Sequence, residues 1–572
     1  MEPQANALKQ ELPDVIVVGS GGAGLAAAAT AALHGLAVVV LEKTPVYGGI
    51  SAISGGGLWI PAHGRSQRPD DLDAGRTYLR SCAGDRFDAE RAEAILRNGP
   101  AMIDFLERHG AFRASVVPGR PDYHPELPGA GFERLLTPVE FDGRRLGAHA
   151  ARLRPPARVL TFLGMMIKPG PDLQHFFKVH RSARSAWFVT RRLARYALHL
   201  LRHGRGMDLL SGNALIGRLA ARLFELGVPI RTGMPVTGLI GENGRVVGVQ
   251  YLSDQGPGEL RCRRGVVLAC GGFGHDAARR RAVFPHSPTG AEHWSPAPPG
   301  NTGDGLRMAE AAGARFSADL AHPAGWCPVS LVPRRAGGHD VFPHLIDRQK
   351  PGIIAVTRHG RRFTNEANSY HDFGAGLIAA CAGEPVARAW LIADHRAIRR
   401  YGLGHVKPAP VPLWSALRSG YLLRGANLGE LAGRAGIDGA TLAATVAEFN
   451  QHAALGADPL HGRGQNVLNR FLGDAEHAPN PCLAPLVTPP YYAVEIRMGE
   501  LGTYAGLMTD ARGRVRHRDG HAIAGLYAAG TDVHSVMGGD YVASGSTLGV
   551  GMTWGYIAAC DLAAVVPDAL QD

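Results

Sequence analysis

The fold is decided by the run Val15-Ile16-Val17-Val18-Gly19-Ser20-Gly21-Gly22-Ala23-Gly24, in which an apolar strand leads directly into a glycine turn and an alanine-rich helix. A second apolar run, 37–41, follows the helix and ends in Glu42. In this pattern Gly19 allows the tight turn, Gly21 lets the backbone approach a pyrophosphate, and Gly24 lets the helix pack closely on the strand. The helix N-terminus offers free N–H groups to phosphates, and Glu42 stands where a ribose hydroxyl needs an acceptor. The stretch therefore predicts a dinucleotide-binding unit.

A second glycine-rich block runs from Glu42 to Gly57 and reads EKTPVYGGISAISGGG. Small residues in such a block let the backbone press against a flat ring, and a nicotinamide enzyme has no need of it. The block resembles the FAD-binding segment of the superfamily that contains fumarate reductases and 3-ketosteroid dehydrogenases. Some members attach FAD covalently through a histidine in this segment, and no histidine lies between Glu42 and Trp59. The resemblance therefore implies noncovalent FAD.

Composition and length limit the number of domains, the cellular compartment and the classes of partner. At 572 residues the chain is too long for one ordinary core, so two domains are expected. The seven cysteines are scattered without CxxC spacing, which argues against a disulfide framework or a metal site and for a reducing, cytoplasmic compartment. The polar residues 1–14 do not read as a secretory signal, and no stretch reaches the roughly eighteen uninterrupted apolar residues of a membrane span. The net charge is +11, but the sequence carries no nucleic-acid motif, so no nucleic-acid partner is expected.

Much of the positive charge lies in residues 152–206, where Asp172 is the single acidic residue. Arginines and lysines alternate there with large apolar side chains such as Phe162 and Trp187. Basic residues beside aromatic ones are typical of a segment that rests on a membrane surface. The alternative is an ordinary helical insertion packed on its own protein with solvated arginines. The residues leave open whether the protein is purely cytoplasmic or also contacts the inner face of a membrane.

The chain between this insertion and residue 330 continues the nucleotide-binding domain. An amphipathic helix is expected over 210–228, followed by a hairpin of 236–240 with 246–250. The apolar run 265–269 ends in glycines and is expected to return to the sheet begun at Val15.

The C-terminal residues complete the same domain. The run 525–530 reads as a strand that ends in small residues, and a helix is expected from Gly551 to about Ala564. We therefore predict an α/β fold with a Rossmann-like FAD-binding domain split into residues 1–330 and 490–572, and an inserted α+β catalytic domain over 331–489. The expected FAD-binding residues are Gly19, Gly21, Gly22, Ala23, Gly24, Glu42, Lys43, Gly49, Ser51, Ser54, Gly55, Gly56, Val236, Gly271, Gly272, Asn301, Asp304, Gly530 and Leu548.

Three tyrosines extend the resemblance over nearly the whole chain outside the insertion. Tyr123 lies in PGRPDYHPELPG, Tyr370 ends GRRFTNEANSY, and Tyr541 precedes Gly545 by the spacing VAS. These segments resemble the active-site segments of the 3-ketosteroid Δ1-dehydrogenases. The chain departs from that family in having no proline between Tyr541 and Gly545, and in Tyr504, where family members often carry a lysine.

The resemblance implies a chemistry for these residues. Desaturation beside a ketone removes a proton from the alpha carbon and a hydride from the beta carbon. The Tyr541 hydroxyl and the Gly545 N–H would donate to the C3 oxygen, as an oxyanion hole does. Tyr370 would take the C2 proton with help from Tyr123, since a free tyrosine, with a pKa of about 10, is a poor base. The C1 hydride would pass to flavin N5.

Other functions stay open at this point. A fumarate-reductase-like enzyme would clamp a dicarboxylate with arginines, whereas the corresponding loop here reads Met537-Gly538-Gly539-Asp540-Tyr541, and an aspartate repels a dicarboxylate. A ketosteroid Δ4-dehydrogenase, another flavin desaturase or an ene-reductase is the nearer alternative, and a flavin-carrying membrane-surface protein without turnover is a third. The expected partners are a hydrophobic 3-ketosteroid and an external electron acceptor.

Overall fold

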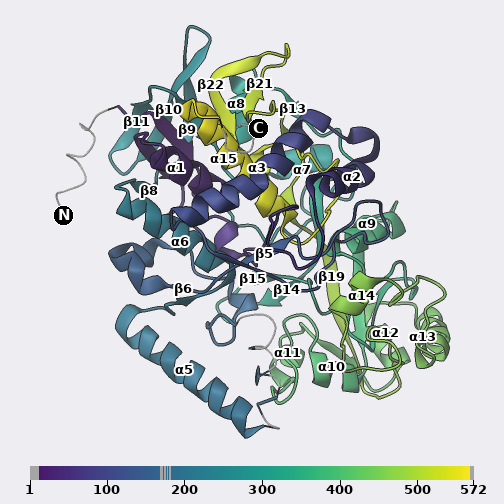
Figure 1. Ribbon diagram of the computed structural model, residues 1–572. Coiled ribbons are helices and arrows are strands. Elements are labelled where there is room, and N and C mark those ends of the chain that lie inside the picture. The colour runs from purple at the N-terminus through teal and green to yellow at the C-terminus, as the bar shows by residue number, and fades with distance from the viewer. Residues whose placement is uncertain (1–11, 168–171, 173–174, 177, 180–181, 567–572) are drawn as a thin grey trace.

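The computed structural model describes residues 12–167, 172, 175–176, 178–179 and 182–566, and Figure 1 shows how their helices and strands are arranged. Two large sheets dominate it. One is formed by segments from the beginning, middle and end of the chain, and the other by the segment between residues 324 and 503.

The first sheet has a parallel centre. Its order is β11 (Gly256–Arg261), β10 (Arg245–Ser253), β22 (Ala522–Ala528), β12 (Gly265–Leu268), β1 (Val15–Val18), β2 (Val38–Glu42) and β8 (Ile230–Thr232). β9 (Val236–Glu242) pairs with β10, and β21 (Arg514–Arg516) with β22. The five strands from β22 to β8 are parallel. Every residue of β1, β2 and β12 is buried, which explains their unbroken apolar sequences.

The helices α1 (Gly22–Leu33), α8 (Asp304–Ala311) and α15 (Ser546–Ala563) contact this sheet. α6 (Ser211–Glu225) packs on α1, α3 (Ala89–Arg108) packs on α15, and α2 (Leu72–Ala83) packs on α3. α7 (Ala277–Val283) follows β12 in the chain. α1 and α15 lie backbone against backbone, because a Cβ added at Gly555 would stand 2.3 Å from the Ala23 carbonyl oxygen. The small residues of both helices thereby hold the first turn of α15 beside the glycine turn after β1.

The second sheet is antiparallel. Its order is β15 (His339–Pro343), β14 (Ala324–Pro333), β19 (Tyr491–Thr503), β17 (Arg388–Ala393) and β16 (Ile353–Thr357), with β18 (Leu423–Gly425) on β19. Its helices are α9 (Tyr370–Ala380), α10 (His395–Tyr401), α11 (Trp414–Arg418), α12 (Leu428–Ala435), α13 (Gly439–Ala454) and α14 (Val467–Leu472). β14 begins before residue 331 and the whole of β19 follows residue 489, so the sheet extends past both expected limits of the inserted segment.

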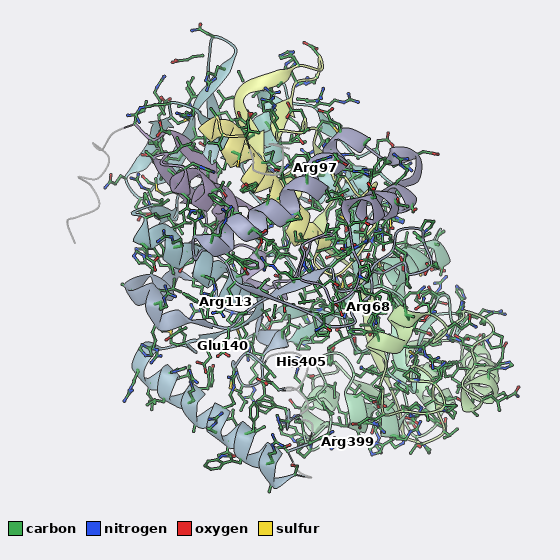
Figure 2. All side chains as sticks on the ribbon, viewed as in Figure 1. Arg68, Arg97, Arg113, Glu140, Arg399 and His405 are labelled. Carbon is green, nitrogen blue, oxygen red and sulfur yellow. The ribbon has the colours of Figure 1, made fainter. Side chains whose placement is uncertain are left out.

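Short strands and one long helix complete the structure. β3 (Leu58–Trp59), β5 (Leu135–Pro138) and β4 (Ala114–Val116) form one small sheet, β6 (Phe141–Asp142) pairs with β7 (Asp208–Leu209), and β13 (Phe316–Ser317) pairs with β20 (Gly506–Leu507). α5 (Ala183–His203) runs along the outside of the molecule (Figure 1). Figure 2 shows Glu140 on the side of the body that faces α5. Arg192 of α5 lies 3.9 Å from Glu140 and from Asp208, and Arg195 lies 2.5 Å from Asp208.

Several local expectations are confirmed. The helix expected over 210–228 is α6, the predicted hairpin is β9 with β10, and β12 lies parallel to β1. The C-terminal strand β22 joins β12, while α15 begins at Ser546, five residues before the expected start at 551. Among the described residues, no helix combines the length and the apolar character that crossing a membrane requires.

Candidate active site

One cavity of about 520 Å³ lies where the parallel strands of the first sheet end, and it continues to the three tyrosines. Ligands bind at the carboxyl ends of strands in open parallel sheets, so its place agrees with the fold. All the expected site residues line this cavity except Gly24 and Gly272. Those two pack tightly inside the protein, with an added Cβ 2.1 Å from the Gly19 carbonyl oxygen and 2.0 Å from Thr503 Oγ1 respectively.

The glycine turn after β1 has the geometry that a close ligand needs. Gly19 has a φ of 106°, and a Cβ there would stand 2.1 Å from the Ala269 carbonyl oxygen, so only glycine fits. A Cβ at Gly21, by contrast, would meet only Ser51 Oγ, at 3.6 Å, since this residue faces the cavity. The N-terminus of α1, capped by Gly21, is thus directed at the cavity with room for a phosphate.

Glu42 is fixed at the same end of the cavity. Its two carboxylate oxygens accept hydrogen bonds from the Ser20 hydroxyl at 2.5 Å and from the Thr44 N–H at 2.9 Å. Lys43 Nζ lies 2.5 Å from a carboxylate oxygen of Asp304. Arg154 donates to Thr44 Oγ1 at 3.0 Å and lines the cavity, and burial lowers the pKa of its guanidinium. Sequence reasoning placed Arg154 in the basic insertion and missed this contact.

The three tyrosines meet at the other end of the cavity. The ring centroids of Tyr123 and Tyr370 are 5.5 Å apart, those of Tyr370 and Tyr541 are 5.0 Å apart, and those of Tyr123 and Tyr541 are 6.0 Å apart. All three side chains are buried. Burial raises the pKa of Tyr541 to about 12, and it raises the pKa of Tyr370 well above 10. Tyr541 is therefore a neutral hydrogen-bond donor at physiological pH.

Gly545 closes the site beside Tyr541. It caps α15 with a φ of 83°, and a Cβ there would stand 2.6 Å from the backbone of Gly57. Its N–H donates no hydrogen bond within the described part of the chain, so it is available to a ligand in the cavity. The positive end of the α15 dipole is directed at the same part of the cavity as the Gly545 N–H.

A buried ion network holds the segment that precedes Tyr370. Arg362 donates to the Glu366 carboxylate at 2.7 Å and to Asp458 at 2.7 Å, and Arg463 donates to Glu366 at 3.2 Å. All four charged side chains are at most 3 % exposed. The charges of both arginines help to lower the pKa of Glu366 to about 2, against the opposing effect of its burial. This network explains the GRRFTNE motif, since it fixes the entry into α9.

Charged residues adjacent to the tyrosines in sequence join their three segments. His124 Nε2 lies 3.0 Å from a carboxylate oxygen of Asp540, and Asp372 lies 4.0 Å from its Nδ1. Burial opposes protonation of His124, but the hydrogen bond to Asp540 and the nearby carboxylates raise its pKa to about 9. A protonated His124 thus holds together residues next to Tyr123, Tyr370 and Tyr541.

Two residues near the tyrosines were not predicted as site residues. Arg120 donates to Ser544 Oγ at 2.6 Å, and Ser544 Oγ lies 2.7 Å from the Tyr123 hydroxyl. Both line the cavity. Each lies within a motif that the sequence singled out, at Tyr123 and at Tyr541, but their meeting across 424 positions of sequence has no local signal.

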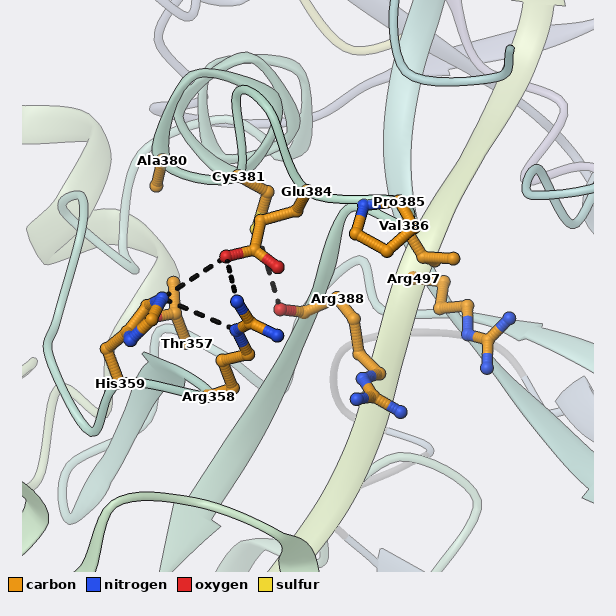
Figure 3. Close-up of a pocket in the computed structure, with 10 residues that line it drawn as sticks. All are labelled: Thr357, Arg358, His359, Ala380, Cys381, Glu384, Pro385, Val386, Arg388 and Arg497. Carbon is orange, nitrogen blue, oxygen red and sulfur yellow. Dashed lines mark hydrogen bonds and ion pairs between the residues drawn. The ribbon is translucent and has the colours of Figure 1, made fainter.

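A second, smaller cavity of about 120 Å³ lies beside β16 and β17 (Figure 3). There Glu384 pairs with Arg358 at 2.7 Å and with His359 at 3.2 Å. The lining of this cavity has three arginines and one acid, Glu384, and contains no tyrosine and no glycine turn. The tyrosine cavity is therefore the candidate active site.

Comparison with known proteins agrees with this site. A family model described as FAD binding domain matches residues 14–548. The chain is 40% identical to 4-oxocyclohex-2-ene-1-carboxylate 5-dehydrogenase of Sinomonas cyclohexanicum, over 96% of this chain and 93% of that protein. It is 38% identical to a 3-oxosteroid 1-dehydrogenase of Mycobacterium tuberculosis, over 96% of this chain and 98% of that protein.

A solved structure extends the likeness to the whole fold. The 3-ketosteroid delta1-dehydrogenase from Sterolibacterium denitrificans, in complex with 1,4-androstadiene-3,17-dione, superposes with a TM-score of 0.89 at 36% identity, covering 97% of this chain and 100% of that one. The chain therefore belongs to the FAD-binding flavoprotein family that includes the 3-oxosteroid 1-dehydrogenases.

Proposed function

We propose that the protein catalyses the flavin-dependent Δ1-dehydrogenation of 3-ketosteroids with noncovalent FAD. The observation that carries this proposal is a single cavity with a dinucleotide cradle at one end and Tyr123, Tyr370, Tyr541 and Gly545 together at the other. A substrate held by the tyrosines would lie against a flavin held by the cradle.

The residues at the cradle end of the cavity fit FAD. The open backbone at Gly21 and the N-terminus of α1 suit the pyrophosphate, and the fixed carboxylate of Glu42 suits a ribose hydroxyl. Arg154 adds a positive charge beside Glu42. FAD, when bound, supplies the acceptor for the hydride that leaves the beta carbon, and an external acceptor then reoxidises it.

The tyrosines supply the acid–base part of the reaction. The neutral Tyr541 hydroxyl and the Gly545 N–H donate to the ketone oxygen and stabilise the negative charge that develops there. Tyr370, in contact with Tyr541 and Tyr123, takes the proton from the alpha carbon. The burial of this site excludes water, which strengthens each of these interactions.

The lining beyond the tyrosines favours a large apolar substrate. Val117, Leu135, Leu160, Leu345 and Ile346 line the cavity. Such a surface suits the fused rings of a steroid, because apolar contact is its main source of affinity.

A second candidate substrate is favoured by one observation. Arg120 lines the cavity, and no carboxylate lies within ion-pair distance of it in the described part of the chain. A monocyclic ketone with a carboxylate, such as the substrate named for the Sinomonas relative, needs the same removal of an alpha proton and a beta hydride and would pair with this arginine.

One experiment separates the candidates. The purified holoenzyme is mixed anaerobically with 4-androstene-3,17-dione, with 4-oxocyclohex-2-ene-1-carboxylate, or, after dye reduction, with fumarate, and the redox state of the flavin is followed. Rapid flavin reduction by the steroid supports the proposal. Preference for the ring carboxylate by kcat/KM selects the second candidate, and reoxidation by fumarate alone refutes both.

We also propose how the chain is divided. Residues 1–330 and 490–572 would form one split, Rossmann-like FAD-binding domain, and 331–489 the inserted catalytic domain. β14, which begins before residue 331, and β19, which follows residue 489, would connect the two. The pairing of β22 with β12 supports this division, because it joins the two outer segments in one sheet. Tyr123 and Tyr541 then come from the outer segments and Tyr370 from the inserted one.

Membrane contact through 152–206 is a further proposal, with a packed insertion as its alternative. Within α5, Trp187 is 70% exposed and Leu201 is 86% exposed, beside exposed arginines such as Arg191 and Arg202. An anionic surface attracts each nearby basic residue by about 1 kcal/mol. Salt-sensitive cosedimentation with anionic vesicles, lost on deletion of α5, would support contact, and full recovery in the supernatant at low salt would favour the packed insertion.

A further inference from the structure

Arg120 contacts Ser544 and the ring of Tyr123, and no carboxylate pairs with it among the described residues. One of its guanidinium nitrogens donates to Ser544 Oγ at 2.6 Å, and its Nε is buried without a hydrogen-bond partner among the described residues. The guanidinium carbon lies 6.0 Å from the ring centroid of Tyr123 and 5.2 Å from that of Phe471. A partly buried cation without a counter-ion is costly, so it favours any negative charge that forms nearby.

Ser544 joins this cation to the tyrosines. Arginine only donates, so Ser544 Oγ accepts from Arg120 and its own proton is free for the Tyr123 oxygen, 2.7 Å away. The Tyr123 ring in turn packs edge to face against the ring of Tyr370, with the two centroids 5.5 Å apart. When Ser544 donates to the Tyr123 oxygen, the Tyr123 proton is left free and can rotate toward its neighbour Tyr370.

We propose that Arg120 and Ser544 are positioning residues that stabilise the Tyr370 phenolate through Tyr123 while it acts as the base. The inference rests on the proposed function, which assigns Tyr370 as the base. In the step, the Tyr370 oxygen forms a bond with the alpha proton, the electron pair of the broken C–H bond moves to the ketone oxygen as an enolate, and Tyr370 becomes a neutral phenol. Arg120 and Ser544 keep their protonation states throughout.

The environment of Tyr370 explains why such help is needed. Burial raises its pKa well above 10, so its phenolate is costly to form without a donor or a positive charge nearby. Arg348, the other arginine near Tyr123, donates to the backbone carbonyls of His344, Glu366 and Asn368 and to no tyrosine. The remaining titratable groups around the three tyrosines are His124, Cys327, His371, Asp372, Tyr504 and Asp540.

Those remaining groups do not supply the positive charge. His124 is paired with Asp540 and stands beside Asp372, so its charge is compensated. Burial lowers the pKa of His371 to about 3, so its ring is neutral. Among the described residues, Arg120 is thus the cation that hydrogen bonds link to one of the three cavity tyrosines, through Ser544 to Tyr123. Its partner Ser544 lies in the short segment where the sequence departs from its family by lacking proline.

The test is the pH dependence of kcat in the holoenzyme with 4-androstene-3,17-dione. A phenolate base gives a kcat that rises with pH, and loss of a stabilising cation raises the apparent pKa. Arg120→Met is therefore expected to move the rising limb up by about 1 to 2 pH units, the effect of a unit charge at roughly 8 Å in an effective dielectric of about 20. At pH values below the rising limb, kcat of the variant is expected to be about 10- to 100-fold lower than that of the wild type, while KM stays within about threefold.

Further variants separate a relay from a structural effect. Ser544→Ala is expected to shift the limb in the same direction, Arg120→Lys to restore much of the wild-type profile, and the double variant Arg120→Met/Ser544→Ala to fall no lower than the worse single variant. Arg68→Met is the matched control, because Arg68 also lies over a ring, that of Phe132 at 4.2 Å, but is exposed. FAD content and melting temperature are measured for each variant.

Three results would overturn the inference: a wild-type pH profile for Arg120→Met, a rise in KM alone, or additive losses in the double variant. A rise in KM alone would make Arg120 a substrate-binding residue. If Arg120→Met does not fold, Ser544→Ala, which removes one hydroxyl, decides the question. Failure of the proposed function is seen separately, because Tyr370→Phe would then retain alpha-proton exchange in deuterated water.

Discussion

Replacing Tyr541 with phenylalanine tests the oxyanion role of this residue most directly. The change removes one hydroxyl from a ring that stays buried, among Tyr123, Tyr370 and Tyr504. Because burial raises the pKa of Tyr541 to about 12, the hydroxyl is protonated at pH 7 to 8 and can only donate to the ketone oxygen.

The magnitude follows from the charge that this oxygen carries in each state. A hydrogen bond to a neutral ketone contributes about 0.5 to 1.5 kcal/mol, so KM is expected to rise by no more than about tenfold. A donor to the developing enolate contributes about 2.7 to 4 kcal/mol in a water-excluded site, so kcat is expected to fall by about 10² to 10³. The Gly545 N–H remains as the second donor and accounts for residual activity.

The assay is anaerobic stopped-flow reduction of bound FAD by a saturating 3-ketosteroid, with the flavin content of each variant measured first. Tyr527→Phe is the matched control, because Tyr527 is also buried but donates to Asp561 at 2.8 Å and does not line the cavity. A Tyr541→Phe enzyme with full flavin content and a reduction rate within tenfold of wild type would refute the oxyanion assignment.

Three further outcomes are expected. Acid precipitation should release the whole yellow chromophore into the supernatant as FAD, and colour that stays with the protein pellet would contradict noncovalent binding. Tyr370→Phe should lose the exchange of the C2 proton with deuterated solvent, whereas continued exchange would point to Tyr123 as the base. Glu366→Gln should lower the free energy of unfolding by about 3 to 5 kcal/mol in urea titrations, since it leaves Arg362 and Arg463 short of a buried counter-charge. The pKa of Glu366 is lowered from 4.5 to about 2, so its contribution is complete above pH 4.5 and is lost as the pH falls through 2; a wild type equally stable at pH 2 and pH 6 would contradict this.

The nucleotide cradle could be predicted because its determinants are contiguous. Gly19, Gly21 and Gly24 act within one turn and one helix, so residue type and spacing contain the geometry. The extent of the second sheet has no such local signal. Its strands β14 and β19 pair with each other across more than 150 positions, and spacing along the chain does not encode that pairing.

The tyrosine site could likewise be predicted only in part. Tyr123, Tyr370 and Tyr541 were predicted from their flanking motifs, and the structure brings them together. Arg120 and Ser544 lie inside those motifs, but their role depends on a hydrogen bond between distant segments. Arg154 was attributed to a surface insertion because its neighbours are basic, although its side chain lines the cavity beside Glu42.

The position of β22 has a consequence for how the protein is made. This strand, Ala522–Ala528, lies between β10 and β12, so a central place of the first sheet is filled by residues that leave the ribosome about 250 residues after those of β12. Until then β12 and β10, which are translated early, have exposed edges that would otherwise bond to β22. Synthesis proceeds at about 5 to 20 residues per second, so the unfinished sheet waits many seconds for its central strand. Nascent chains that stop before residue 522 are therefore expected to be bound by chaperones and to lack the cradle residues Gly530 and Leu548.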